Sequence, residues 1–155
     1  MPSVRIGLIS DTHGLLRPEA IQALQGVDHI IHAGDIGSSR ILEQLAEIAP
    51  VTAVRGNNDH GAWADALPAE TTIESGGMTL HVLHDIKELD PDVNASTVQV
   101  VVSGHSHRPA IAKQNGMLFV NPGSAGPRRF KLPISLAFLE IAQEKGEAKL
   151  RMLDL

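Results

Sequence analysis

Residues 4–13, VRIGLISDTH, join a predicted strand to two potential metal ligands. Residues 4–10 are rich in apolar and β-branched side chains and predict a buried strand. Asp11 and His13 follow directly, and since residues i and i+2 of an extended chain point to the same side, both side chains can reach one ion. Alone, the pair is weak support for a metal site, because Asp-x-His beside Gly14 is also typical of an ordinary turn.

Two further strands in the first half of the chain also end in polar residues. Residues 29–33 and 51–54 predict strands, which are followed by Gly34-Asp35 and by residues 56–59, GNND. The segments between the strands predict amphipathic helices, one over residues 18–25 that begins with a proline and one capped by Ser38 or Ser39 that ends at Ile48. This alternation predicts right-handed crossovers and a parallel sheet.

The second half of the chain has the pattern of hairpins. Predicted strands over 71–74 and 78–83, over 111–113 and 117–120, and over 134–142 and 148–153 flank short turns, and the turn at residues 114–116 contains Asn-Gly, a strong hairpin signal. A short helix around residues 92–96 and an apolar strand over 98–102 are expected between the first two pairs. One parallel half and one hairpin-rich half predict two packed mixed sheets with helices outside.

Potential ligands gather at the predicted strand ends. Asp35 by itself is typical of a helix cap, and residues 57–59 are typical turn formers. Ligand sites in open α/β sheets, however, lie beyond the carboxyl ends of strands, where the first three strands all carry such residues. His84 follows strand 78–83, and His105 and His107 repeat the i, i+2 spacing after strand 98–102. We therefore expect one shared site, whose carboxylate, amide and imidazole donors suit divalent ions.

The other four histidines favour a structural interpretation. His29 and His32 lie in or beside the second strand, His60 lies in a loop, and His81 is on the outward alternation of its strand. His32 could also orient the loop that carries Asp35, although a hydrogen-bonded core histidine is the more common role.

Composition limits the class of protein. The chain has 155 residues, which we interpret as a single domain over 1–155 that can form one core. Its net charge of −5 argues against an extended nucleic-acid surface or an anionic membrane as partner. It has no cysteine and no apolar run long enough to span a bilayer. From the strand predicted at residues 4–10 we also expect no signal peptide. We expect a cytoplasmic protein, with a homo-oligomer through apolar hairpin residues as one possibility.

The ordered motifs resemble those of the calcineurin-like metallophosphoesterase superfamily. They are Asp11-x-His13, Gly34-Asp35, Gly56-Asn57-x-Asp59, His84 and Gly104-His105-x-His107, and with Asn121-Pro122-Gly123-Ser124 they are similar to its compact YfcE-type phosphodiesterase branch. The resemblance implies a four-layer αββα sandwich with a two-metal site at one rim. It also implies that Asp35 bridges two ions, one held with Asp11, His13 and His107, and the other held with Asn57, His84 and His105.

The activity implied by the resemblance is that of a metal-dependent phosphoesterase. We expect a phosphodiesterase that hydrolyses small phosphodiesters with a hydroxide held by a binuclear centre. Two divalent ions per chain are expected, Mn²⁺ first, with Fe²⁺, Zn²⁺, Mg²⁺ or Ni²⁺ as alternatives. Asp35, Asn57, Asp59 and His105 are expected to act in catalysis, and Asn58 and Arg128 to contact substrate. Arg128 and Arg129 can each offer a guanidinium fork to phosphate, although a solvated pair is the simpler interpretation.

Two positions depart from the family pattern. Asn58 stands where many members carry a histidine that donates a proton or contacts phosphate, which disfavours efficient phosphomonoesterase activity unless a water or His60 supplies the proton. Asp85 stands where a glycine is frequent, and its carboxylate could orient His84 or repel anionic substrates. Two other functions stay open: a non-catalytic scaffold of the same fold, like the retromer subunit, and a phosphomonoesterase or nucleotidase. Retention of all seven ligand positions favours catalysis.

Overall fold

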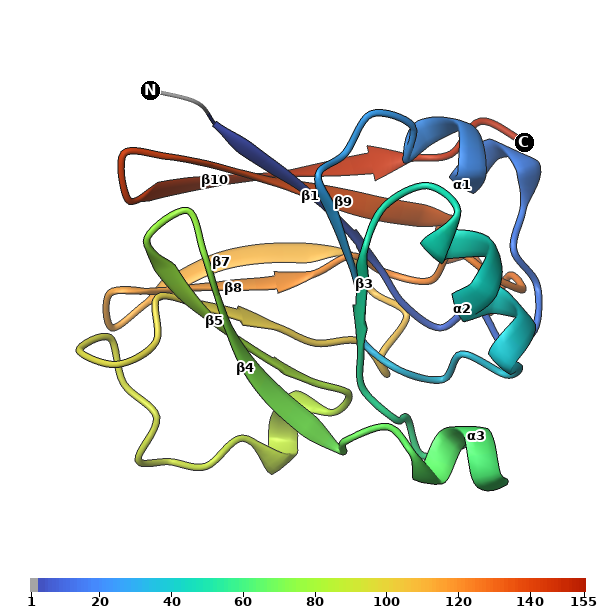
Figure 1. The fold of residues 1–155 in the computed structure, drawn as a ribbon, viewed down its shortest axis with the longest axis horizontal. Helices are drawn as coiled ribbons and strands as arrows, with labels where there is room; N and C mark the ends of the chain where they lie inside the picture. Colours follow the sequence, from blue (N-terminus) through green and yellow to red (C-terminus); the bar gives the residue numbers. More distant parts are fainter. Residues whose placement is uncertain (1–2) are drawn as a thin grey trace.

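The computed structural model of the chain describes residues 3–155 and contains two five-stranded sheets (Figure 1). The first sheet has the order β10-β9-β1-β2-β3, built from β1 (Val4–Ile9), β2 (His29–His32), β3 (Val51–Ala53), β9 (Ser135–Ala142) and β10 (Lys145–Met152). The second has the order β4-β5-β6-β8-β7, built from β4 (Glu70–Ser75), β5 (Met78–Leu83), β6 (Val100–Val102), β7 (Ala110–Gln114) and β8 (Met117–Asn121). Both sheets are mixed, as predicted, because each combines a parallel set of three strands with antiparallel hairpin strands.

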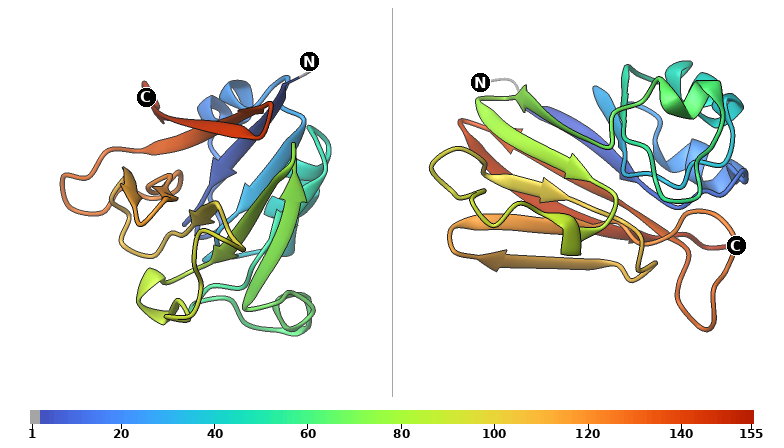
Figure 2. Two further views of the ribbon diagram at one scale, coloured as in Figure 1. Left: turned by 90° about the vertical axis from the view of Figure 1, so that its left-hand side faces the viewer. Right: turned by 90° about the horizontal axis from the view of Figure 1, so that it is seen from below.

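The two longer helices cover the outer face of the first sheet. They are α1 (Pro18–Ala23) and α2 (Ser39–Ala46), and Figures 1 and 2 show both on the same side of that sheet, away from the second. Pro18 occupies the first turn of α1, where its missing N–H is not needed. Ser38 caps α2 by accepting a hydrogen bond from the Arg40 backbone N–H at 3.2 Å. These two sequence signals therefore set the starts of both helices.

The main core lies between the two sheets, and strand alternation determines which side chains enter it. In β1, Ile6 and Leu8 pack toward the second sheet against residues such as Val100, whereas Ile9 packs toward the helices. Gly7 also faces the helices: a Cβ there would collide with the Leu24 side chain, so the lack of a side chain lets α1 approach the sheet. Burial on both faces explains the almost continuous apolar run.

The outer face of the second sheet is covered mainly by loops. The segment between β5 and β6, residues 84–99, is called the covering segment. It holds one short 3₁₀ helix, η1 (Ile86–Glu88), and packs apolar side chains against the sheet. The predicted helix at residues 92–96 is wrong, since turns occupy this stretch. Asn94 Oδ1 accepts a hydrogen bond from the Ser96 N–H at 3.0 Å, and Asp90 Oδ1 accepts one from the Asp92 N–H at 2.9 Å. Such side-chain acceptors compete with helical hydrogen bonding. The predicted sandwich is otherwise confirmed, with its fourth layer mostly irregular.

The parallel arrangement brings several strand ends to one rim of the sandwich. Within each sheet the parallel strands have their carboxyl ends on the same edge, and β1, β2, β3, β5 and β6 are each followed by predicted ligand residues. The short helix α3 (Ala62–Asp65) follows the loop after β3. In the part of the chain that the structure describes, every helix is too short or too polar to cross a bilayer.

Candidate metal centre

Two groups of three side chains lie at this rim, each with potential ligand atoms within 4.8 Å of one another. The members come from the loops after β1, β2, β5 and β6, so both sheets contribute. The first group consists of Asp11, His13 and His107, and the second of Asp35, His84 and His105. All six were predicted to belong to one site, and the fold brings them together from positions almost a hundred residues apart.

Two carboxylates connect the groups. Asp35 Oδ2 lies 3.7 Å from His13 Nε2 in the first group and 3.2 Å from His84 Nε2 in its own group. Asp11 Oδ1 lies 3.5 Å from His107 Nε2 and 3.9 Å from His84 Nε2. Because single carboxylate oxygens reach imidazoles of both groups, the two groups form one continuous donor cluster. Asp35 Oδ2 thus lies close to an imidazole of each group.

The backbone at these residues adopts an unusual conformation. Of the nine non-glycine residues within 3–155 that have a left-handed φ, five belong to the cluster: Asp11 (56°), His13 (45°), Asp35 (54°), His105 (72°) and His107 (62°). This conformation costs about 1–2 kcal/mol for each residue with a Cβ. It persists where surrounding contacts over-determine it, and such residues concentrate at functional sites.

Hydrogen bonds between the loops supply those contacts. The His13 N–H donates to the Asp35 carbonyl at 2.9 Å, and the Gly104 N–H donates to the His84 carbonyl at 2.9 Å. The His105 N–H donates to Asp11 Oδ2 at 3.1 Å, which joins the loop after β6 to the loop after β1. The cluster is therefore held by the backbone of both sheets.

Three buried side-chain atoms of the cluster residues have no hydrogen-bond partner. They are Asp11 Oδ1, His84 Nε2 and His107 Nδ1. Leaving a buried polar atom without a partner costs about 1–3 kcal/mol, and cations coordinated by Asp11 Oδ1 and His84 Nε2 would remove that cost for these two atoms. Carboxylate and imidazole donors suit divalent ions of intermediate hardness. The residues present thus fit a divalent metal site.

The surroundings favour a charged Asp35 and a neutral His107. Burial alone would raise the pKa of Asp35, but contact with His84 and hydrogen bonds from Asn58 outweigh it and hold the pKa well below its usual range. Burial raises the pKa of Asp11 despite the attraction of His84 and His107. Burial lowers the pKa of His107, assisted by His13 and Arg129, so its imidazole is available as a neutral ligand at neutral pH.

His84 has the opposite balance. Burial lowers its pKa, but the contact with Asp35 and the charge of Asp11 raise it more, so the net pKa lies above the usual value. Its Nδ1 lies 2.8 Å from the Ala33 carbonyl and donates to it, which leaves Nε2 directed at the carboxylates. A hydrogen bond of this kind fixes the tautomer of a ligand histidine.

The loop after β3 places three consecutive polar residues in different roles. Asn57 lines the cavity in front of the cluster together with Asp35 and His105. Asn58 donates twice to Asp35, from its backbone N–H to Oδ1 at 2.9 Å and from Nδ2 to Oδ2 at 3.1 Å. Asp59 is buried and accepts three backbone N–H bonds, so its carboxylate fixes the loops and does not line the cavity.

The cavity in front of the cluster has a volume of about 290 Å³ and a basic wall. Arg128 and Arg129 both line it, together with His13 and His107. The Arg128 guanidinium also donates to the Leu132 carbonyl at 3.3 Å, within its own loop. The predicted substrate residues Asn58 and Arg128 therefore both border the cavity.

Several supporting residues were not predicted as part of the site. Ser10 Oγ donates to Asp11 Oδ2 at 2.8 Å, and Ser124 Oγ donates to the Asp11 carbonyl at 3.1 Å. Asn121 Nδ2 donates to the Gly104 carbonyl at 3.0 Å. The motif Asn121-Pro122-Gly123-Ser124 is the only sequence signal that could have pointed to them, since a serine beside an aspartate is too common to indicate a role.

The remaining histidines have structural hydrogen bonds, as expected, where they are buried. His32 is fully buried: its Nδ1 accepts from the Gly34 N–H at 3.1 Å and its Nε2 lies 3.0 Å from Thr12 Oγ1. Burial, together with the charge of His84, lowers its pKa to about 3. His81 is on the outward alternation of β5, opposite to Leu80 and Val82, as predicted, and is buried there beside Thr72. His60 is exposed in its loop.

Comparison with known proteins agrees with this geometry. The model of the calcineurin-like phosphoesterase superfamily domain matches residues 4–144. A probable metallophosphoesterase of Methanocaldococcus jannaschii is 34% identical over 94% of this chain and 79% of its own length. An archaeal phosphodiesterase has a similar structure, with a TM-score of 0.81 at 24% identity, covering 97% of this chain and 100% of that one.

A third similar structure is that of Vps29 from Entamoeba histolytica in complex with Zn²⁺. It has a TM-score of 0.72 at 18% identity and covers 97% of this chain and 100% of that one. These two structures share the fold, whereas the family model and the sequence relative match nearly the whole chain in sequence. The chain therefore belongs to the calcineurin-like phosphoesterase superfamily.

Proposed function

We propose that this chain is a phosphodiesterase that acts on small phosphodiesters with two divalent metal ions. The observation that carries the proposal is the position of Asp35, whose Oδ2 atom lies near imidazoles of both ligand groups at the base of a cavity with two arginines in its wall. A two-metal site of this kind is suited to in-line displacement at phosphorus. The similar archaeal phosphodiesterase structure and the family membership support the same reaction class.

The proposed ligand sets share Asp35. One ion would be held by Asp11, His13, His107 and Asp35, and the other by Asp35, Asn57, His84 and His105. When bound, the two ions would supply a water of lowered pKa and stabilise negative charge on the phosphate oxygens. We propose Mn²⁺ as the native metal, although Fe²⁺, Zn²⁺, Mg²⁺ and Ni²⁺ are compatible with oxygen and imidazole donors.

The remaining residues position these groups and the substrate. Asn58 holds the Asp35 carboxylate through two hydrogen bonds and thereby favours its charged form. Arg128 and Arg129 would contact the non-bridging phosphate oxygens through their guanidinium groups. His105 and Asn57 are the exposed members of the proposed ligand set at the cavity and would face the entering substrate. Asp59 acts as a positioning residue through the loops that it joins.

The direct test is hydrolysis of a chromogenic phosphodiester. The Mn²⁺-loaded protein should release p-nitrophenolate from bis(p-nitrophenyl) phosphate, and exhaustive chelation should abolish the release because no group in the cavity would then activate water. Re-addition of Mn²⁺ to the chelated protein serves as the control for irreversible damage. Turnover that survives complete metal removal would sink the proposed reaction.

A scaffold function is the second candidate, because Vps29 shares the fold. The Entamoeba histolytica Vps29 structure is itself a complex with Zn²⁺, so metal content alone does not separate a scaffold from an enzyme. The hydrolysis measurement separates them, since a scaffold predicts bound metal without turnover. The retained cluster and its cavity favour the enzyme.

Position 58 should determine the balance between monoester and diester hydrolysis. An alkyl phosphomonoester has a poor leaving group that needs a proton, and a positioned general acid contributes about 10²–10⁴-fold. Asn58→His should therefore raise kcat for glycerol phosphate at least about tenfold over Asn58→Ala, which loses the same side-chain hydrogen bond to Asp35 without adding a proton donor. Paired rates on both ester classes measure the effect. Equal rates for the two variants would show that residue 58 does not reach the leaving group, and a strong monoester preference in the unmodified protein would reverse the proposed ranking.

A further inference from the structure

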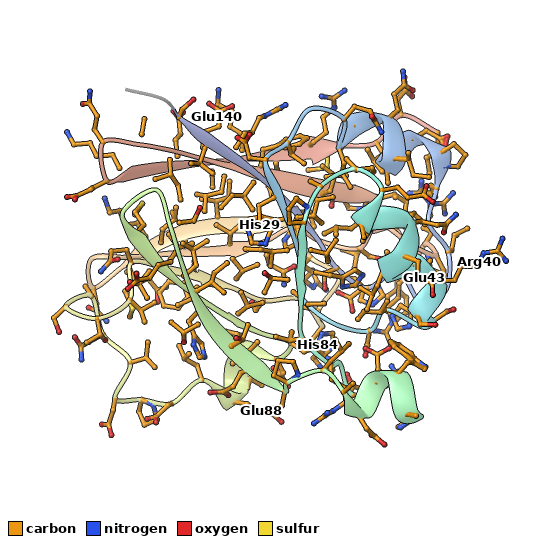
Figure 3. All side chains as sticks on the ribbon, in the orientation of Figure 1. His29, Arg40, Glu43, His84, Glu88 and Glu140 are labelled. Atoms are coloured by element: carbon orange, nitrogen blue, oxygen red, sulfur yellow. The ribbon has the colours of Figure 1, made fainter. Side chains whose placement is uncertain are left out.

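A second cavity borders the metal centre. It has a volume of about 240 Å³ and opens between the loop after β3 and the segment that begins η1. Asn57 and His105 line both this cavity and the basic cavity already described, so the two meet at the proposed metal ligands. Figure 3 shows His84 and Glu88, which both line the second cavity, near one another at the same edge of the molecule.

The wall of the second cavity carries two carboxylates without cationic partners. Asp85 Oδ1 accepts the Lys87 N–H at 3.1 Å, and its Oδ2 lies 3.9 Å from His105 Nε2. Glu88 is exposed, and across residues 3–155 no lysine or arginine forms an ion pair with either carboxylate. Of the two roles that the sequence left open for Asp85, orientation of His84 is disfavoured, because the carboxylate faces His105.

Arg55 is the one arginine in this wall, which has no lysine, and its guanidinium donates to backbone carbonyls. Its Nη1 donates to the Leu67 carbonyl at 2.7 Å and to the Ala64 carbonyl at 3.3 Å. These bonds hold the guanidinium against the turn after α3. The wall therefore carries two carboxylates and one guanidinium that is turned toward backbone carbonyls, which leaves a net negative charge of one.

The two cavities thus have walls of opposite charge and meet at one centre. The first has Arg128 and Arg129 in its wall and the second has Asp85 and Glu88. A phosphodiester has two arms that leave the phosphorus in different directions, so the two cavities are suited to different substituents. His84 connects the second cavity to the centre, because it lines that cavity while its Nε2 is directed at the Asp35 and Asp11 carboxylates.

We propose that the second cavity binds a positively charged arm of the phosphodiester, with Asp85 and Glu88 as the specificity-determining residues. The inference rests on the proposed phosphodiesterase function and narrows its substrate class to diesters that carry an ammonium or similar cation a few bonds from the phosphate. Unlike charges at partly exposed positions attract by an amount that corresponds to about a tenfold difference in binding. Diesters with a second anionic group on that arm are repelled by the same residues.

Two esters with the same leaving group test the proposal. p-Nitrophenyl phosphorylcholine carries a quaternary ammonium, and p-nitrophenyl 3,3-dimethylbutyl phosphate is its uncharged isostere. The Mn²⁺-loaded protein should have a kcat/KM for the choline ester about tenfold above that for the isostere, mainly through KM. In the double variant D85N/E88Q this ratio should fall to about one. Both substitutions keep side-chain size, and the amide introduced at position 85 keeps an oxygen that can accept the Lys87 N–H, as Asp85 does in the unmodified protein.

The matched control removes two charges from the same covering segment outside the cavity. D90N/D92N lowers the net negative charge by the same amount, and neither residue lines the second cavity, so the ratio should stay at its original value. The single variant E88Q changes an exposed residue and should fold normally. Its ratio of kcat/KM for the two esters should lie below that of the unmodified protein. A ratio near one in the unmodified protein, or a ratio that persists in D85N/E88Q, would overturn this inference while leaving phosphodiester hydrolysis intact. If the Mn²⁺-loaded protein hydrolysed neither ester, the proposed function would be overturned, and this inference with it.

Discussion

Asp35→Asn should lower kcat/KM for bis(p-nitrophenyl) phosphate by about a thousandfold in the presence of Mn²⁺. The substitution keeps the shape of the side chain but removes the charge of the carboxylate that we propose as the shared ligand of both ions. Lewis-acid stabilisation by a metal ion contributes several kcal/mol to the transition state, and each 1.36 kcal/mol is a factor of about ten in rate. Metal content measured by mass spectrometry should fall together with the rate, because the variant lacks the shared anionic ligand.

The control for Asp35 is an aspartate at the opposite end of the same strand. Asp28 precedes β2, and its carboxylate accepts the Arg5 N–H at 2.8 Å, far from the cluster. Asp28→Asn should bind metal and turn over substrate like the unmodified protein. If Asp35→Asn kept its activity within about tenfold, the shared-ligand role would be wrong, since such a loss is no more than removal of an outer-shell hydrogen bond produces.

Asp59→Ala should have the largest effect on stability among the residues around the site. The buried Asp59 carboxylate accepts N–H bonds from Ile36 at 3.1 Å, Gly37 at 2.9 Å and Gly56 at 2.9 Å, so it joins the loop after β2 to the loop after β3. Truncation leaves three donors without this acceptor, and hydrogen bonds to charged groups each contribute about 1.5–3 kcal/mol. Allowing for partial replacement by water, we expect a loss of about 3–5 kcal/mol in the free energy of unfolding.

Calorimetry checks the Asp59 prediction. For a chain of this length, such a loss corresponds to a decrease in Tm of about 10 °C. Asp65→Asn, in the short helix α3, removes a charge without breaking a described hydrogen bond of its side chain and should leave Tm nearly unchanged. The Asp59 variant should also bind metal more weakly at temperatures where it is folded, because Asp35 and Asn57 lie in the two loops that it joins. A decrease in Tm below about 2 °C would show that these loops do not depend on the carboxylate.

Local pattern predicted most of the fold. Strand alternation around Ile6 and Leu8, the proline at the start of α1 and the Asn-Gly turn at residues 115–116 act over a few residues, so their structural effect follows from nearby sequence. The helix expected at residues 92–96 failed for a reason of the same scale, since Asn94 and its neighbours bond their own backbone. Strand and helix ends differ from prediction by a few residues where pairing with another strand determines the boundary.

The candidate site was predictable to a similar degree. The identity of the proposed ligands followed from their chemistry and from their common place after strands, and six of the seven lie in the two groups at one rim. The cytoplasmic location, the homo-oligomer and the single-domain interpretation stay predictions from sequence. The role of Asn58 did not follow from its position in the motif, because it depends on the approach of Asp35 from a loop 23 residues away.

Sequence alone therefore established which donor types this chain carries, in which order, and that each follows a strand. Folding in three dimensions established how they are connected: that Asp35 reaches both groups, that Asp59 joins two loops by three hydrogen bonds, and that Asp85 faces His105 across a separate cavity. The physical reason is the separation along the sequence of the residues that interact. Side-chain chemistry and backbone periodicity are properties of neighbouring residues, whereas these contacts arise from the register and packing of two sheets whose strands come from the whole length of the chain.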